Sequence, residues 1–281
     1  MKKFILFAIV SLGAALLPEA PARAHGPLFS PAPETIFRGG TELTLGLHTE
    51  KAAQKATGAR SRDYGVSVEA EYGITANWQI GIELPYVRRQ SGSLGKADGL
   101  GDITLDSKYQ FWKRDLPGAQ YKATALVRLK LPTGSDNGAV PLGSGRADVT
   151  MGLTTGYESR RWYWFASGVY QLSAGGAANL GKGDRQSLNL VGGIRPVLSP
   201  YNKPDTVLML ELNWGRSGRD SLGGAPLVNT GGWEMFLSPV VWWTYRQLAI
   251  RGGIQIPLAN GLNGVQLSPR TRGRLEFVYH F

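Results

Sequence analysis

Residues that could perform acid–base or nucleophilic chemistry are scarce in this chain. It contains three histidines, His25, His48 and His280, and no cysteine. A lipid-cleaving barrel enzyme needs a nucleophile and a base close together near the lipid boundary, yet no serine stands two residues after His48. We therefore expect no catalytic residues, and a lipid hydrolase is the least favoured of three candidate functions.

Residues that could hold a metal ion do not cluster along the sequence either. No run of histidine, cysteine and acidic residues has the spacing of a metal-ligand motif. Processing that made His25 the new N-terminus would let its amine and imidazole chelate a metal, but a terminal histidine without fixed structure is the simpler interpretation. We expect neither a metal site nor a cofactor.

Charged residues recur at alternate positions of the chain, and the chemistry they offer is electrostatic. Alternate positions of a strand share one face of a sheet. Opposed walls of acids and bases inside a closed sheet would create a transverse field that orients polar solutes, although the same charges could pair and seal the interior. The residues expected to line this interior are Glu42, His48, Glu69, Glu71, Glu83, Asp106, Lys108, Lys122, Arg128, Lys130, Arg195, Glu211, Arg251, Arg274 and Glu276.

The N-terminus has the layout of a secretory signal peptide. Lys2 and Lys3 precede an apolar run over residues 4–17, which is shorter than the about 20 residues of a membrane-spanning helix. Small residues at 22–24 supply a cleavage point. We expect residues 1–24 to be removed, residues 25–38 to form a periplasmic N-terminal extension that could plug the barrel mouth, and residues 39–281 to form the barrel.

Strands are predicted from about residue 41 onward, because apolar and polar residues alternate with period two. Val66 and Val68 fall on one face, and Glu69 and Glu71 on the other. Each segment is close to the about 9–11 residues that a tilted strand needs to cross a bilayer. The twelve predicted strands are 41–49, 64–73, 78–87, 102–112, 121–131, 147–157, 162–172, 185–195, 206–214, 234–243, 248–257 and 271–281.

The connections between these segments alternate between short and long. Outer-membrane barrels have an even number of strands, short periplasmic turns and long extracellular loops. The predicted fold is therefore all-β: a transmembrane antiparallel up-and-down barrel of 12 strands, with both ends of the mature chain in the periplasm.

Pro239 lies inside one predicted strand and implies a bulge or a misplaced boundary. Aromatic residues that gather at the short turns predict an interfacial girdle: Tyr72, Trp78, Tyr109, Phe111, Trp112, Tyr121, Tyr157, Trp162, Trp164, Trp242, Trp243 and Tyr245.

The last strand carries an apolar face that reaches the final residue. Leu275, Phe277, Tyr279 and Phe281 alternate with polar residues. This ending resembles the C-terminal signal of outer-membrane barrels, which the barrel-assembly machinery reads. The last strand must present lipid-facing side chains while it pairs with the first strand to close the barrel.

Three short glycine-rich motifs give the chain a family resemblance. They are Gly99-Leu100-Gly101-Asp102, Leu131-Pro132-Thr133-Gly134, and Gly143-Ser144-Gly145 followed by Asp148. Over roughly residues 40–281 the chain resembles the family named for the phenol-degradation meta-pathway. The resemblance implies an outer-membrane barrel with passage of small compounds, aromatic ones among them, and it supplies no catalytic residues. Asp102, Asp148 and Asp184 are more simply explained as turn caps than as an acidic ring.

The leading functional hypothesis is a passive outer-membrane channel for small solutes, with aromatic or anionic compounds as candidates. The alternative is a structural or surface-interaction barrel with an occluded lumen, because twelve strands lie between the packed eight-stranded and the open sixteen-stranded barrels. The formal net charge is +10. In the outer membrane, the expected partners are membrane lipid and lipopolysaccharide, the assembly machinery and a small-molecule solute, and no nucleic acid.

Overall fold

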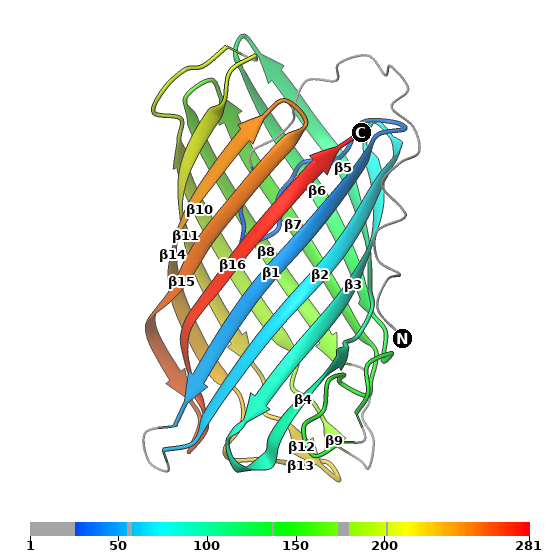
Figure 1. Cartoon of the computed structure of the whole chain (residues 1–281), viewed down its shortest axis with the longest axis vertical. Coiled ribbons are helices and arrows are strands. Elements are labelled where there is room, and N and C mark those ends of the chain that lie inside the picture. The colour runs from blue at the N-terminus through cyan, green and yellow to red at the C-terminus, as the bar shows by residue number, and fades with distance from the viewer. Residues whose placement is uncertain (1–25, 55–57, 137, 174–179, 201) are drawn as a thin grey trace, which may run out of the picture.

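A computed structural model describes residues 26–54, 58–136, 138–173, 180–200 and 202–281. The expected signal peptide and His25 lie outside these residues. Within them, twelve long strands form one closed antiparallel barrel (Figure 1), and no helix is long and apolar enough to cross a bilayer. The strands are β1 (Thr41–Ala53), β2 (Arg60–Thr75), β3 (Trp78–Ser91), β5 (Thr104–Leu116), β6 (Ala119–Lys130), β7 (Asp148–Ser159), β8 (Trp162–Ser173), β10 (Arg185–Ile194), β11 (Asp205–Ser217), β14 (Gly232–Tyr245), β15 (Leu248–Leu262) and β16 (Ser268–His280).

The barrel closes where the first strand meets the last. Strands adjacent in the chain pair with one another, and β1 pairs with β16. In this seam Leu43 lies opposite Tyr279 and Leu45 lies opposite Phe277. All four side chains are exposed on the outer surface. The apolar pattern at the C-terminus therefore forms half of a lipid-facing seam.

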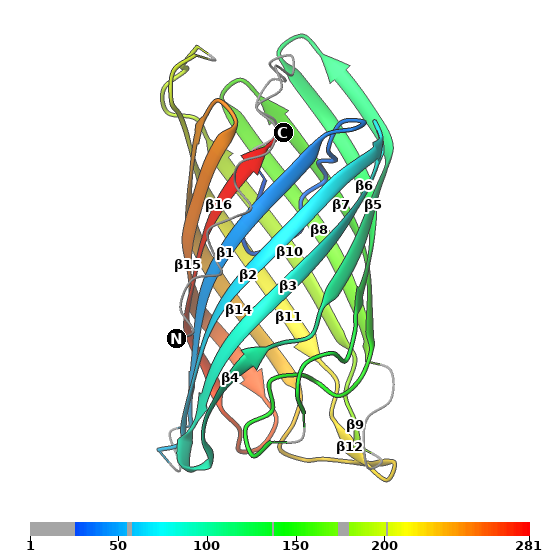
Figure 2. The same ribbon diagram turned by 45° about the vertical axis from the view of Figure 1, so that its right-hand side comes forward.

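The two ends of the barrel differ, as predicted. One end, the short-turn end, carries tight connections such as 76–77, 117–118 and 246–247. The other, the long-loop end, carries the 3-10 turn η1 (Gly92–Leu94) and the short strands β4 (Gly95–Leu100), β9 (Leu180–Gly181), β12 (Ser221–Leu222) and β13 (Ala225–Pro226) (Figure 2). In an outer-membrane barrel the short-turn end faces the periplasm.

Several strands run further than predicted into the long-loop end. Residues 88–101 were expected to be a loop, but Arg88 to Ser91 continue β3 and pair with both β2 and β4. Above the lipid both faces of a hairpin meet water, so the period-two pattern fades while the backbone ladder continues. Sequence alternation therefore locates the lipid-crossing part of a strand rather than its end.

The two faces of the wall follow the predicted alternation. Val66 and Val68 are exposed to the membrane side, whereas Ser67 between them is buried inside. A register shift between Gln110 and Trp112 on β5 leaves both Phe111 and Trp112 on the outer face. Because a bulge adds one residue to a strand, it can turn two neighbouring side chains to the same side.

Two predicted features of β14 are wrong. Trp242 was assigned to the outer girdle, but it is only 4% exposed and lies in the inner core. Pro239 lies inside β14 with no bulge at its position, and the register shift falls instead between Met235 and Phe236. β14 pairs with β15 on both sides of Ser238 and Pro239 but not at these two residues. A local gap in the ladder accommodates the missing N–H of proline.

Candidate functional site: the barrel lumen

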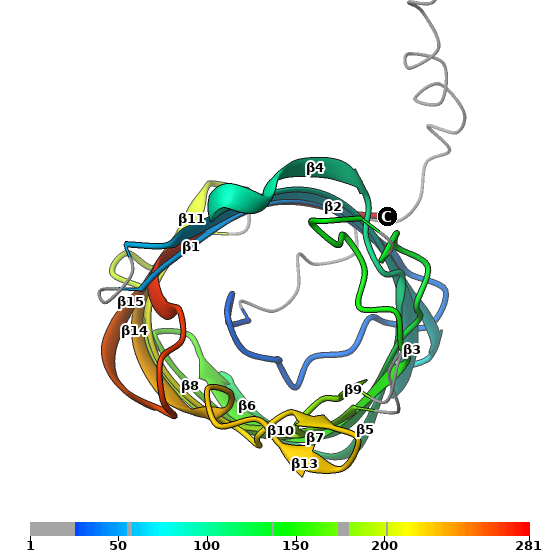
Figure 3. The same ribbon diagram turned by 90° about the horizontal axis from the view of Figure 1, so that it is seen from below.

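Residues 26–40, termed the N-terminal segment, cross the interior of the barrel (Figure 3) and lead into β1 at the short-turn end. Glu211 on β11 is the main anchor and is fully buried. Its carboxylate accepts hydrogen bonds from the backbone N–H of Leu28 at 2.6 Å, the N–H of Phe29 at 3.2 Å and the hydroxyl of Ser30 at 2.7 Å. A carboxylate that accepts several such bonds holds the backbone in one place.

The other end of the segment is held at the opposite wall. The N–H of Ile36 donates to Gln79 at 2.8 Å, and the Thr124 hydroxyl donates to the carbonyl of Pro33. At Gly73 the backbone approaches so closely that a Cβ atom would lie 2.1 Å from the carbonyl oxygen of Phe37. A glycine is therefore required at residue 73 for the segment to dock.

Apolar side chains fill the inner space beside the segment near the short turns. Leu28 joins a buried cluster on the inner wall, and Phe29 packs against it. The sequence pattern implied an inner face that is polar throughout. This half is apolar instead, because the docked segment shields it from water. The wall residues of the cluster are Tyr163, Phe165, Val191, Val207, Met209, Val240, Trp242, Ala249 and Val278.

Glu34 is a buried carboxyl within the segment. Its nearest cation is Lys122, with Oε1 and Nζ 3.9 Å apart, and Lys122 is itself bound to Glu158 at 2.9 Å. Among the described residues the Glu34 oxygens have no hydrogen-bond partner. Burial raises the pKa of Glu34 to about 7 and the Glu158 carboxylate adds to this, while Lys122 and, more weakly, Lys108 act in the opposite direction.

Docking of the N-terminal segment should weaken as the pH rises. The Glu34 carboxyl has a pKa of about 7 when docked and an ordinary value of 4.5 when released. Docking is therefore strongest below pH 4.5, weakens between pH 4.5 and 7, and loses at most about 3 kcal/mol in total. Since the chain has no cysteine, a single spin label on Thr35→Cys would report this release as increased mobility between pH 5 and 8. The same label in a Glu34→Gln background should lose this pH dependence, and an unchanged transition there would contradict the assignment.

The half of the lumen nearer the long loops holds a cavity of about 590 Å³. Residues 27–32 of the segment form part of its lining. The structure brings most of the predicted interior residues together around it: His48, Glu69, Glu71, Glu83, Asp106, Lys108, Arg128, Arg251, Arg274 and Glu276.

Charge is unevenly distributed around this cavity. The acids Glu69, Glu71, Glu83 and Asp106 lie on the neighbouring strands β2, β3 and β5, with Lys108 bound to Glu71 at 3.2 Å. A second stretch of the wall, on β15 and β16, is separated from β2 only by β1 and carries bases together with Glu276, which pairs with two of them. A further base, Arg185, lies on β10 across the lumen from β2. A solute in the cavity would therefore meet an acidic stretch of wall beside a basic one. The bases are Arg185, Arg251, Arg272 and Arg274.

Five predicted interior residues lie away from the cavity. Glu211 anchors the segment, and Lys122 binds Glu158. Glu42 binds His280 at 3.0 Å, and Arg195 binds Asp205 at 2.8 Å. Lys130 pairs with Asp148. Glu211 thus holds the segment, and the other four residues form ion pairs along the wall instead of facing the cavity.

Sequence reasoning missed several lumen residues. Arg185 and Arg272 were left out of the predicted lining, although each sits at an inward position of a predicted strand. Gln79 was recognised as inward but not as a contact of the segment. Continuing the period-two count to the first residues of these two strands would have found both arginines, whereas the contacts of the segment leave no periodic signal.

The glycine-rich motifs meet at the long-loop end. Asp102 accepts hydrogen bonds from the N–H of Gly134 at 3.0 Å and from the N–H of Ser144 at 2.8 Å. Asp184 accepts from the N–H of Ser173 at 3.2 Å. Asp102 and Asp184 thus cap loops as predicted, and Asp148 instead pairs with Lys130 and Arg146. The motifs that carry the family resemblance form a single loop-anchoring cluster.

Comparison with known proteins agrees with this architecture. A family described as "Putative MetA-pathway of phenol degradation" matches residues 83–194. The crystal structure of the COG4313 outer membrane channel from Pseudomonas putida F1 is similar, with a TM-score of 0.75 and 16% identity, covering 91% of this chain and 100% of that one. The beta domain of the Bordetella autotransporter BrkA aligns with a TM-score of 0.52 and 13% identity, covering 86% and 100%. No curated protein matches the sequence. The chain therefore has the closed β-barrel fold of outer-membrane channels, and its residues 83–194 match the family model of the phenol-degradation meta-pathway.

Proposed function

We propose that this protein is an outer-membrane channel that passes small solutes by diffusion through its lumen. The observation that carries the proposal is the cavity of about 590 Å³, which is lined by charged side chains and bounded toward the periplasm by the N-terminal segment. That segment has no regular secondary structure and is held by a limited set of hydrogen bonds. A segment of this kind can shift without breaking the barrel ladder.

Planar-bilayer recording of the refolded protein tests the channel directly. We expect discrete conductance steps whose size depends on salt concentration. Folding would be checked first by circular dichroism and by the heat-dependent mobility that closed barrels show in gels. Folded protein that conducts at no voltage, pH or salt concentration would rule out the proposal.

Selectivity should follow the charges that face the cavity. Arg128 and Glu83 both line it, and within the described residues neither forms an ion pair. Because a screened charge contributes about 0.2–1 kcal/mol, Arg128→Gln should change the cation-to-anion permeability ratio about 1.5- to 5-fold toward cations. Glu83→Gln is the matched control and should shift it toward anions. Reversal potentials in a KCl gradient measure both, and shifts of the same sign would contradict a path along this wall.

The proposed solutes are small aromatic or anionic compounds. The family description names phenol degradation, and the arginine-rich wall of β15 and β16 would attract carboxylates. Liposome-swelling assays that compare aromatic acids with neutral sugars of similar size test this class. Equal rates for the two would leave a general diffusion channel in its place.

An occluded structural barrel is the second candidate, and the docked N-terminal segment favours it. The apolar cluster and the ion pairs of Lys122 and Arg195 close much of the short-turn half. A lipid hydrolase stays the least favoured candidate, and His280 is engaged by Glu42 at 3.0 Å. Removal of the segment separates the open channel from the occluded barrel, because only the open channel would conduct more without it.

Export and surface contacts complete the proposal. Residues 1–24 would direct export and be removed, and the apolar face of β16 would be read by the assembly machinery. Many exposed bases at the long-loop end would face lipopolysaccharide phosphates. They include Arg60, Arg62, Arg88, Lys96, Arg216, Arg219 and Arg270.

A further inference from the structure

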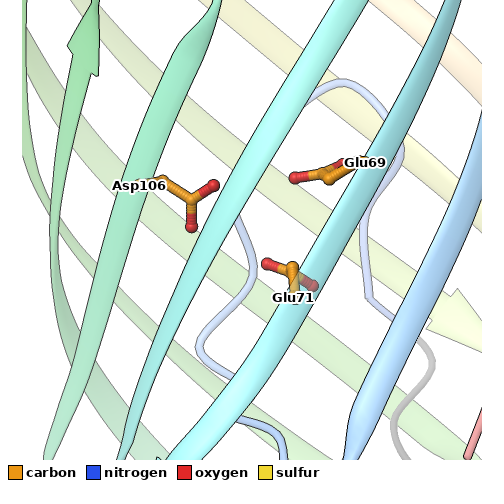
Figure 4. Close-up of side chains that lie close together, drawn as sticks. All are labelled: Glu69, Glu71 and Asp106. Atoms are coloured by element: carbon orange, nitrogen blue, oxygen red, sulfur yellow. The ribbon is translucent and has the colours of Figure 1, made fainter.

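Three carboxylates converge on the inner wall of the lumen although they come from separate strands. Glu69 and Glu71 extend from β2, and Asp106 extends from β5, with β3 between these strands (Figure 4). One oxygen of each residue lies within 4.8 Å of the other two. Figure 4 shows the carboxylate of Asp106 turned toward those of Glu69 and Glu71 across β3.

Gly81 on the intervening strand makes this convergence possible. It pairs with Glu71 on one side and with Asp106 on the other, so the three residues form one row across the wall. A Cβ atom at residue 81 would lie 2.7 Å from Oδ1 of Asp106. Asp106 therefore leans over the glycine toward β2, through space that any other residue would occupy.

Asp106 has no hydrogen-bond partner for either carboxylate oxygen among the described residues. It is only 7% exposed. A buried carboxylate without a partner is costly, and Arg128, its register neighbour on β6, does not bind it. A buried carboxylate without a donor, turned toward two other acids, favours a bound cation at this point.

Lys108 forms an ion pair with one of the three carboxylates, that of Glu71. Its ammonium binds Oε1 of Glu71 at 3.2 Å, the same oxygen that accepts from Gln79 at 2.6 Å. The other oxygen of Glu71 takes neither of these contacts. With Lys108 included, the three carboxylates retain a net charge of −2 when ionised, which one divalent cation would neutralise.

We propose that Glu69, Glu71 and Asp106 bind a calcium ion on the inner wall of the lumen. The donors are all carboxylate oxygens, which suit hard cations. Two oxygens bound to one Ca²⁺ can be about 4.6–5.2 Å apart at most, whereas Mg²⁺ permits only about 4.0–4.2 Å. The three oxygens lie within 4.8 Å of one another, a spacing that the larger and more flexible coordination shell of Ca²⁺ accommodates. In the proposed channel, a bound ion would remove the negative charge of this wall and favour anions.

Calcium titration of the refolded protein, in detergent and free of lipopolysaccharide, tests the site by calorimetry. We expect one saturable Ca²⁺ site per chain and weaker binding of Mg²⁺. Asp106→Asn and Glu69→Gln should each weaken Ca²⁺ binding at least about tenfold. Gly81→Ala should weaken it too, although every carboxylate remains, because the added methyl displaces Asp106.

Glu234→Gln is the matched control, since it removes an inward carboxylate from β14, remote from the cluster, and it should leave Ca²⁺ binding unchanged. Circular dichroism would confirm that each variant is folded. Absence of saturable binding, or equal binding by the parent and Asp106→Asn, would overturn the proposal. The binding test needs no conductance, so its failure and the failure of the proposed channel are separate results.

Discussion

Removal of residues 27–36 is expected to raise the single-channel conductance several-fold. Residues 27–32 line part of the cavity, and the segment crosses the lumen toward the periplasm. Without them the path widens from the charged half of the lumen to the short-turn end, and the apolar cluster that Leu28 covers becomes wet. Planar-bilayer recording of the deletion variant beside the parent chain measures the difference.

A point variant guards against a deletion that fails to fold. Glu211→Ala removes the acceptor of the Leu28, Phe29 and Ser30 hydrogen bonds, and each buried donor left unpaired costs about 1–3 kcal/mol. The segment should then detach part of the time, so the variant should show frequent transitions to a larger conductance. Ser187→Ala is the control, because Ser187 faces the same cavity without a hydrogen bond to the segment in the described residues. Folded variants that conduct like the parent would favour the occluded structural barrel.

Leu190→Arg should destabilise the barrel by about 2–4 kcal/mol. Leu190 lies in the middle of β10, is 60% exposed and projects from the outer face between Ala166 and Leu212. An arginine there would place a charge in the hydrocarbon layer. Urea unfolding of the protein in lipid vesicles, followed by tryptophan fluorescence, measures the change in the free energy of unfolding.

Leu222→Arg is the matched control for this substitution. Leu222 is also exposed but lies in β12 at the long-loop end, outside the barrel wall. Its replacement should change the free energy of unfolding by no more than about 0.5 kcal/mol. Equal effects at the two positions would mean that Leu190 does not face lipid.

The barrel could be predicted from sequence because lipid imposes a simple rule on each crossing strand. Val66 and Val68 must face hydrocarbon, and Ser67 and Glu69 must not, so the period is visible without any partner. The rule fails where lipid no longer acts. Arg88 to Ser91 continue β3 beyond the membrane without a period-two pattern. Trp242 faces the interior and packs in the cluster that contains Leu28, so its apolar side chain does not mark a lipid-facing position.

The candidate site was less accessible to sequence reasoning because its parts meet only in three dimensions. Inward charges such as Lys108 and Arg251 could be assigned by counting positions. The docking of Leu28 on Glu211 joins residues 183 positions apart, and nothing in a proline-rich coil indicates its partner. The approach of Asp106 to Glu71 also depends on a glycine in a third strand, which a count along one strand does not reveal.

The anchoring of the N-terminal segment has a consequence for biogenesis. The segment continues directly into β1, which forms one side of the seam. Its main anchor, Glu211, lies on β11, which is reached from β1 by crossing the seam and passing β16, β15 and β14. A nascent barrel that lacks β11 cannot offer this anchor. The segment can reach its final place only when the wall beyond the seam has been laid down, so its protection from a protease added in the periplasm would time the completion of the cylinder.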